Sequence, residues 1–154
     1  KYYYGDEETK YYEDNDERAI FFARGVIETI KKLNWVPDII HLNGWMSSMI
    51  PIYLKTFYKK DSYFNDTKLV MSHYNEDVVP FDSGIEEKLK FDNITGLSAL
   101  KNPNSETFLL DSIDFVDVIS KGDEFLEGNL DQKFNYTKVQ KSEYLDSENF
   151  NKIY

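Results

Sequence analysis

Apolar residues recur at intervals of three and four after a polar, acidic start, and this spacing predicts a long first helix. The stripe consists of Ile20, Ala23, Val26, Ile27, Ile30 and Leu33. Asp14 or Asn15 is a suitable cap, and Glu17 stands three residues after Asp14, the spacing of a capping box. Asn34 and Pro37 mark its end.

Short apolar runs between turn residues predict strands over 38–42, 68–72, 115–120 and 136–140. Helical patterns lie between them, over 46–60, 86–91, 105–114, 121–130 and 142–154. Pro51 leaves two alternatives for the helix over 46–60. Either it lies in the first turn of a helix that begins near Ser47 or Ser48, or it kinks a helix that begins at Trp45.

Alternation of short strands with helices is the pattern of βαβ units on a parallel sheet. We therefore predict the α/β class, with a Rossmann-like parallel sheet flanked by helices. Ligands of such sheets bind beyond the carboxyl ends of the strands. The three clearest strands end in the polar sequences "HLN", "SHY" and "SKG".

Composition narrows the classes of partner and site. The 154 residues suffice for one domain, and the net charge of −10 argues against nucleic acid and against an anionic membrane surface. With no cysteine and two histidines, thiolate or histidine metal sites are not expected, and no cofactor is predicted. No apolar run reaches membrane-spanning length and no signal peptide is visible, so the expected location is the cytoplasm. The first residue is Lys, which favours a fragment of a longer protein.

The turn after the first strand holds the main candidate site residues. His41 is either a structural histidine or a pocket residue, whereas Asn43 is better placed to bind a ligand. Gly44 serves the tight turn. Trp45 is expected to pack in the core, with stacking on a sugar ring as the alternative.

The run from Asp14 to Lys55 resembles the starch and bacterial glycogen synthases that use ADP-glucose. That family has an acidic-Asn-x-x-Arg helix start, a Leu-Gly-Trp-x-Pro-Asp turn, and a His-x-His-Asp-Trp motif that leads into a helix with an internal Pro. The matching positions are Asp14, Asn15, Arg18, Leu33, Trp35, Pro37, Asp38, His41, Trp45, Pro51 and Lys55. The chain also resembles a short subgroup of bacterial glycogen synthases.

This resemblance implies the GT-B arrangement, in which two Rossmann-like domains face each other across a cleft. It implies transfer of glucosyl from ADP-glucose to an α-1,4-glucan, with retention of configuration and without a metal. Residues 1–154 would form a partial first domain on the acceptor side. The family's Lys-x-Gly-Gly-Leu loop and its nucleotide-binding second domain have no counterpart in the chain.

Departures from the family motif fall at the expected site. Asn43 stands at the family's second His and Gly44 at its Asp, and an amide does not carry a proton at neutral pH. The family's Thr-x-His-Asn motif, aligned at Ser72, places Tyr74 at the His position. His73 falls one residue early, which in a strand turns its side chain to the opposite face.

Two hypotheses remain open from the sequence. The first is a fragment of a glucosyltransferase, with substrate-binding residues His41, Asn43, Gly44, Trp45 and Tyr74, that has no turnover by itself. The second is a catalytically inactive glycosyltransferase-like module that binds glucan or a protein partner. An exposed apolar face on a truncated sheet would also favour a homo-oligomer.

Overall fold

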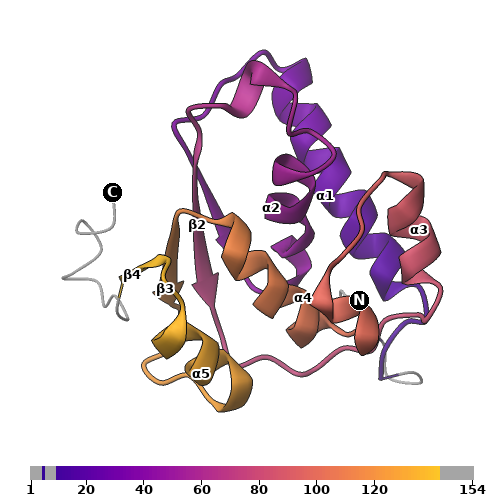
Figure 1. The fold of residues 1–154 in the computed structure, drawn as a ribbon, viewed down its shortest axis with the longest axis vertical. Coiled ribbons are helices and arrows are strands. Elements are labelled where there is room, and N and C mark those ends of the chain that lie inside the picture. Colours follow the sequence, from indigo (N-terminus) through magenta and orange to yellow (C-terminus); the bar gives the residue numbers. More distant parts are fainter. Residues whose placement is uncertain (1–4, 6–9, 143–154) are drawn as a thin grey trace.

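The computed structural model describes residue 5 and residues 10–142 of the chain (Figure 1). The helices are α1 (Asn15–Lys32), α2 (Met49–Lys55), α3 (Ile85–Phe91), α4 (Ser105–Ser112) and α5 (Gly128–Tyr136). The strands are β1 (Ile39–Asn43), β2 (Lys68–His73), β3 (Val118–Lys121) and β4 (Gln140–Ser142). Short 3₁₀ turns cover 45–47, 62–64, 98–101 and 113–115. None of the described helices is both long enough and apolar enough to cross a lipid bilayer.

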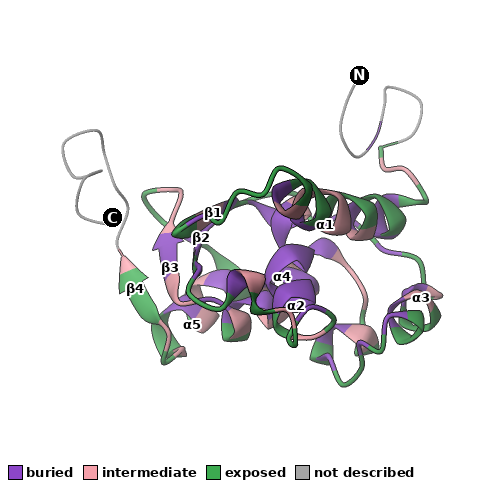
Figure 2. Cartoon of the chain, turned by 90° about the horizontal axis from the view of Figure 1, so that it is seen from above, coloured by how far each residue is buried: buried purple, intermediate pink, exposed green. Residues whose placement is uncertain are grey.

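The four strands form one sheet in the order β1-β2-β3-β4, and every neighbouring pair is parallel. The connections between successive strands carry the helices that cover one face of the sheet. Figure 2 shows α2, α4 and α5 on that side of the sheet. The predicted Rossmann-like parallel sheet is therefore confirmed. All four carboxyl ends lie at one edge of the sheet.

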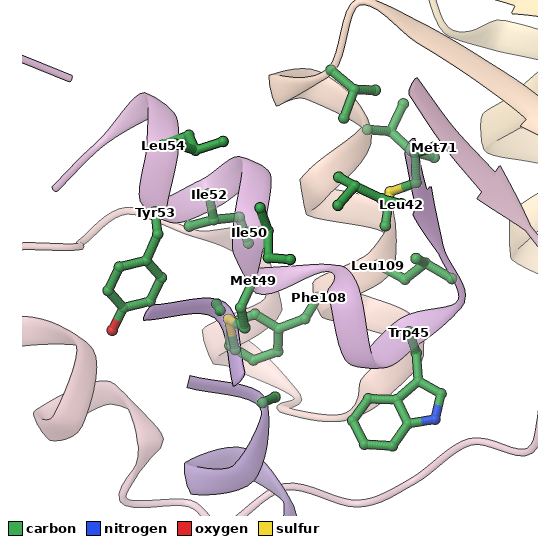
Figure 3. Close-up of a cluster of buried hydrophobic side chains, with 14 of the residues drawn as sticks. Leu42, Trp45, Met49, Ile50, Ile52, Tyr53, Leu54, Met71, Phe108 and Leu109 are labelled. Atoms are coloured by element: carbon green, nitrogen blue, oxygen red, sulfur yellow. The ribbon is translucent and has the colours of Figure 1, made fainter. Parts of the chain in front are cut away.

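The hydrophobic core lies between this face of the sheet and the helices (Figure 3). Leu42 pairs in register with Met71, and Met71 with Ile119, so the three side chains form a row under α4. The hydroxyl of Ser112 in α4 donates to the sulfur of Met71 over 3.2 Å. Burying a side chain such as Met71 stabilises the fold by about 1.5–3 kcal/mol. This row fixes which face of each strand points away from the helices.

The start of α1 differs from the predicted capping box. Asp14 precedes the helix, but its side chain makes no cap hydrogen bond. Instead its carboxylate accepts a 2.8 Å hydrogen bond from Nε of Arg18, one turn further on. Asp16 is buried and takes a 2.7 Å ion pair from Lys88 of α3. A local ion pair with Arg18 and a tertiary ion pair with Lys88 thus replace side-chain capping at this end.

Three other predicted boundaries were wrong. Helix α2 begins at Met49 and has Pro51 in its first turn, in agreement with the first alternative, but it ends at Lys55 instead of residue 60. Thr56 leaves helical geometry at φ −118° and ψ −81°. Residues 113–115 form a 3₁₀ turn and β3 begins only at Val118.

The predicted helix over 121–130 was also placed too early. Residues 122–127 form a loop, and α5 begins at Gly128, whose φ of +56° suits glycine. The strand predicted over 136–140 is β4, displaced to Gln140–Ser142. The predicted helix over 142–154 lies outside the described residues except for Ser142, which ends β4.

A buried ionic network joins α1, α2 and the end of α3. The carboxylate of Asp92 accepts a 2.6 Å hydrogen bond from the Tyr53 hydroxyl and two of 3.1 Å from Arg24. Burial, together with this hydrogen bond, raises the pKa of Tyr53. These contacts offset the free-energy cost of burying the Asp92 carboxylate, whose side chain is only 5% exposed.

Candidate functional site

Two of the predicted site residues meet where β1 and β2 end. The hydroxyl of Tyr74 donates to Oδ1 of Asn43 over 3.0 Å. The ring of Tyr74 lies over Gly122, just after β3, so closely that a Cβ on Gly122 would stand 2.3 Å from it. Burial raises the pKa of Tyr74. Tyr74 therefore connects the ends of three strands.

His41 and His73 lie on opposite faces of the sheet. Nε2 of His41 is 2.8 Å from the hydroxyl of Ser72, across the β1–β2 pair. Burial lowers the pKa of His41. Strand β2 continues through His73, whose ring is 1% exposed and points away from Ser72. His73 thus does not join Asn43 and Tyr74.

Gly44 and Trp45 form the turn between β1 and α2. Gly44 has φ +67° and ψ 178°, a conformation essentially restricted to glycine. The Trp45 side chain is 4% exposed and packs against Phe81, with ring centroids 5.7 Å apart. This burial favours the core-packing alternative over sugar stacking.

Sequence reasoning missed two residues that follow Tyr74. Asn75 holds the loop after β3: its backbone N–H donates to Asp123 over 2.7 Å, its side-chain amide donates to the Phe125 carbonyl, and its Oδ1 accepts from the Glu127 N–H. Glu76 accepts a 2.8 Å hydrogen bond from the backbone N–H of Trp45. Their only signal in the sequence is their position just after a parallel strand.

Two cavities open at this edge of the sheet. The first, which we call the carboxyl-edge pocket, has a volume of about 230 Å³, and its lining includes Trp45, Tyr74, Glu76, Asp77, Glu106 and Glu127. The second, the α1–β1 groove, has about 710 Å³ and is mostly apolar; its lining includes Phe21, Phe22, Ile40, Asn43, Trp45 and Glu76. His41 also lines the groove. Trp45 and Glu76 belong to both cavities.

The chemistry of the carboxyl-edge pocket suits hydroxyl groups better than phosphate. Its described lining has four carboxylates, those of Glu76, Asp77, Glu106 and Glu127, and no Lys or Arg. Burial raises the pKa of Glu76, with a further contribution from nearby Asp123. Among the described residues, no group of three or more metal-binding side chains is close enough to hold an ion.

Comparison with known sequences gives a consistent family. The family model of the starch synthase catalytic domain matches residues 1–121. A glycogen synthase of Chlorobium phaeobacteroides is 36% identical over 110 residues, 69% of this chain and 22% of that protein. One from Chlorobium limicola is 43% identical over 70 residues, 44% of this chain and 14% of that protein. The chain thus spans less than a quarter of the length of these relatives.

A solved structure supports the fold. The catalytic domain of starch synthase IV from Arabidopsis thaliana, bound to ADP and acarbose, superposes with a TM-score of 0.64 at 15% sequence identity. The superposition covers 94% of this chain and 31% of that one. Together, the parallel sheet, the polar carboxyl edge and a match over most of the sequence show that the chain belongs to the starch synthase catalytic domain family.

Proposed function

We propose that this chain is the acceptor-side part of a glycogen or starch synthase that transfers glucosyl from ADP-glucose to an α-1,4-glucan. In this reaction the bond between glucose C1 and the diphosphate oxygen breaks, and ADP leaves with the bonding electrons. C1 then bonds to the 4-hydroxyl oxygen of the glucan end, and the proton of that hydroxyl is released. Configuration at C1 is retained.

The observation that carries the proposal is the Asn43–Tyr74 pair, in which Tyr74 lines the carboxyl-edge pocket and Asn43 lines the adjoining α1–β1 groove. Because Oδ1 of Asn43 accepts from Tyr74, its NH₂ group is left to donate to a sugar oxygen. At about 230 Å³, the pocket is smaller than the roughly 300–1,000 Å³ typical of drug-sized ligands, so it suits one sugar ring and not a whole nucleotide sugar. The ADP and acarbose bound to the Arabidopsis relative support the same chemical class of ligands.

The electrostatics of the carboxyl-edge pocket support separate binding sites for the glucan acceptor and the nucleotide. A departing diphosphate needs positive charge or N–H donors, which usually provide the largest part of catalysis. The described lining offers carboxylates instead. We therefore propose that this chain binds the glucan acceptor and has no turnover alone, while the nucleotide is bound by another part of the parent protein.

The free edge of the sheet supports an incomplete domain. Among the described strands, β1 pairs only with β2, and the α1–β1 groove runs beside it. Phe21 of α1 is 80% exposed there. Exposed strand edges and apolar patches are normally covered. We propose that the rest of the domain, or a second copy of the chain, covers this edge. We also propose that the enzyme is cytoplasmic and binds neither nucleic acid nor membranes.

One observation favours the second candidate, an inactive glucan-binding module. Asn43 replaces a histidine of the family motif, and no amide takes up a proton at neutral pH. The length of the parent gene product separates the two candidates. A second domain of similar size in the parent supports the enzyme, and a parent too short for one supports the module.

The test is calorimetric titration of the parent protein with maltoheptaose and, separately, with ADP-glucose. The enzyme requires both to bind, and Asn43→Ala should weaken maltoheptaose binding about tenfold through the loss of a hydrogen bond to the sugar. Glucan binding without donor binding supports the module. If neither ligand binds, both candidates are wrong.

A further inference from the structure

The Glu76 carboxylate lies against Gly44, although 31 residues stand between the two in the sequence. A Cβ built on Gly44 would lie 2.8 Å from Oε1 and 2.9 Å from Oε2 of Glu76. The carboxylate therefore fills the volume that a side chain at position 44 would need. It also accepts the Trp45 N–H, the first donor after the turn. Both contacts act on the segment that carries Asn43.

The turn itself needs such a partner. The backbone of Gly44, at φ +67° and ψ 178°, lies in a region essentially restricted to glycine, and fixing a glycine in one conformation costs more entropy than fixing any other residue. Other contacts of the turn include a 3.3 Å hydrogen bond from the Gly44 N–H to the Ser72 carbonyl and bonds from Ser47 to the Asn43 and Gly44 carbonyls. The Ser47 bonds hold the carbonyls of the turn, and the Gly44 bond joins the turn to β2. Glu76 holds the donor side of the turn by accepting the Trp45 N–H.

We propose that Glu76 is a positioning residue of the acceptor site, which holds the Asn43–Gly44–Trp45 turn and so orients Asn43 toward the sugar. The motif of the related synthases has an acidic residue at position 44, whereas this chain has glycine there and a carboxylate from position 76 in the same space. The absence of a side chain at position 44 thus leaves room for the Glu76 carboxylate, across the β1–β2 pair. This inference rests on the proposed function only for the identity of the ligand.

The ionisation of Glu76 is observable, because burial sets it apart from exposed carboxylates. Its pKa is raised by burial, opposed by the Trp45 hydrogen bond and assisted by the charge of Asp123. The other charged or titratable groups that line the cavities around it are Arg18, His41, Tyr74, Asp77, Glu106 and Glu127. A control must therefore neutralise one of these without touching the turn, and Asp77→Asn does so.

The decisive experiment is amide NMR of the ¹⁵N-labelled 154-residue chain from pH 4 to pH 8, without sugar. The Trp45 amide should move as Glu76 ionises, in wild type and in Asp77→Asn alike. In Glu76→Gln this movement should vanish, while the side-chain NH₂ of Asn43 keeps its wild-type position because an acceptor oxygen remains. A Trp45 amide that does not titrate in wild type, or that still titrates in Glu76→Gln, overturns the inference.

Calorimetric titration with maltoheptaose then tests whether holding the Asn43–Gly44–Trp45 turn affects sugar binding. Glu76→Leu, which removes the acceptor, should weaken binding about tenfold, whereas Glu76→Gln should stay within about threefold. Equal weakening by Glu76→Gln and Glu76→Leu overturns the positioning role, since charge alone would then matter. If the wild-type chain does not bind maltoheptaose, the proposed function fails for this chain, and the NMR titration still decides the role of Glu76.

Discussion

Acid should destabilise this protein through His73. The ring is 1% exposed, and neither Nδ1 nor Nε2 has a hydrogen-bond partner among the described residues. Burial lowers its pKa to about 4, from an ordinary value of 6.5. Between pH 6.5 and pH 4 the imidazole of His73 is protonated in the unfolded chain and neutral in the folded chain. The free energy of unfolding therefore falls as the pH falls.

The size of the effect follows from the shift. A difference of about 2.5 pKa units at about 1.36 kcal/mol each corresponds to roughly 3 kcal/mol. This stability is fully present above pH 6.5 and is lost progressively down to pH 4. A loss of that size is a large fraction of the about 5–15 kcal/mol that stabilises a typical domain.

Urea unfolding at a series of pH values, followed by tryptophan fluorescence, measures this loss in wild type and in His73→Leu. The variant replaces the unpartnered ring by an apolar side chain, so its stability relative to wild type should rise by about 3 kcal/mol between pH 7.5 and pH 4. His41→Leu is the matched control, because the chain has only two histidines. Parallel curves for wild type and His73→Leu would refute the reasoning.

Three further substitutions test other parts of the structure by the same urea assay. Asp92→Ala should cost about 1–3 kcal/mol because it leaves the buried Tyr53 hydroxyl without an acceptor, and adding Tyr53→Phe should recover part of the loss. Gly44→Ala should cost about 1–3 kcal/mol from backbone strain, and Glu76→Ala in the same chain should remove the clash but not the strain. Asn104→Ala should cost about 1 kcal/mol, because Asn104 caps α4 in a capping box; an unchanged stability would contradict the cap.

The sequence predicted the fold well because the strands are marked locally. Apolar runs between breakers identify β1 and β2 within a residue or so, and the alternation with helices gives the parallel sheet. The errors lie where distant contacts override local pattern. Residues 122–127 look helical, yet three hydrogen bonds with Asn75, two donated by it and one accepted, hold them as a loop. The cap predicted at Asp14 is an exception, because its side chain pairs with Arg18 only one turn away.

The candidate site was predictable only in part. The position of Asn43 follows from parallel-sheet geometry, and Tyr74 from the resemblance to a known motif. The contact between Glu76 and the Gly44 turn joins residues 31 positions apart and leaves no periodic or local signature. Only the three-dimensional structure brings them together.

The ring of Tyr74 over Gly122 has a consequence for related sequences. A Cβ at position 122 would stand 2.3 Å from the ring, so any larger residue there would displace Tyr74 from Asn43. Positions 74 and 122 are therefore expected to vary together in descendants of this chain. Glycine at 122 should accompany an aromatic ring at 74, and a side chain at 122 should appear only where residue 74 is small.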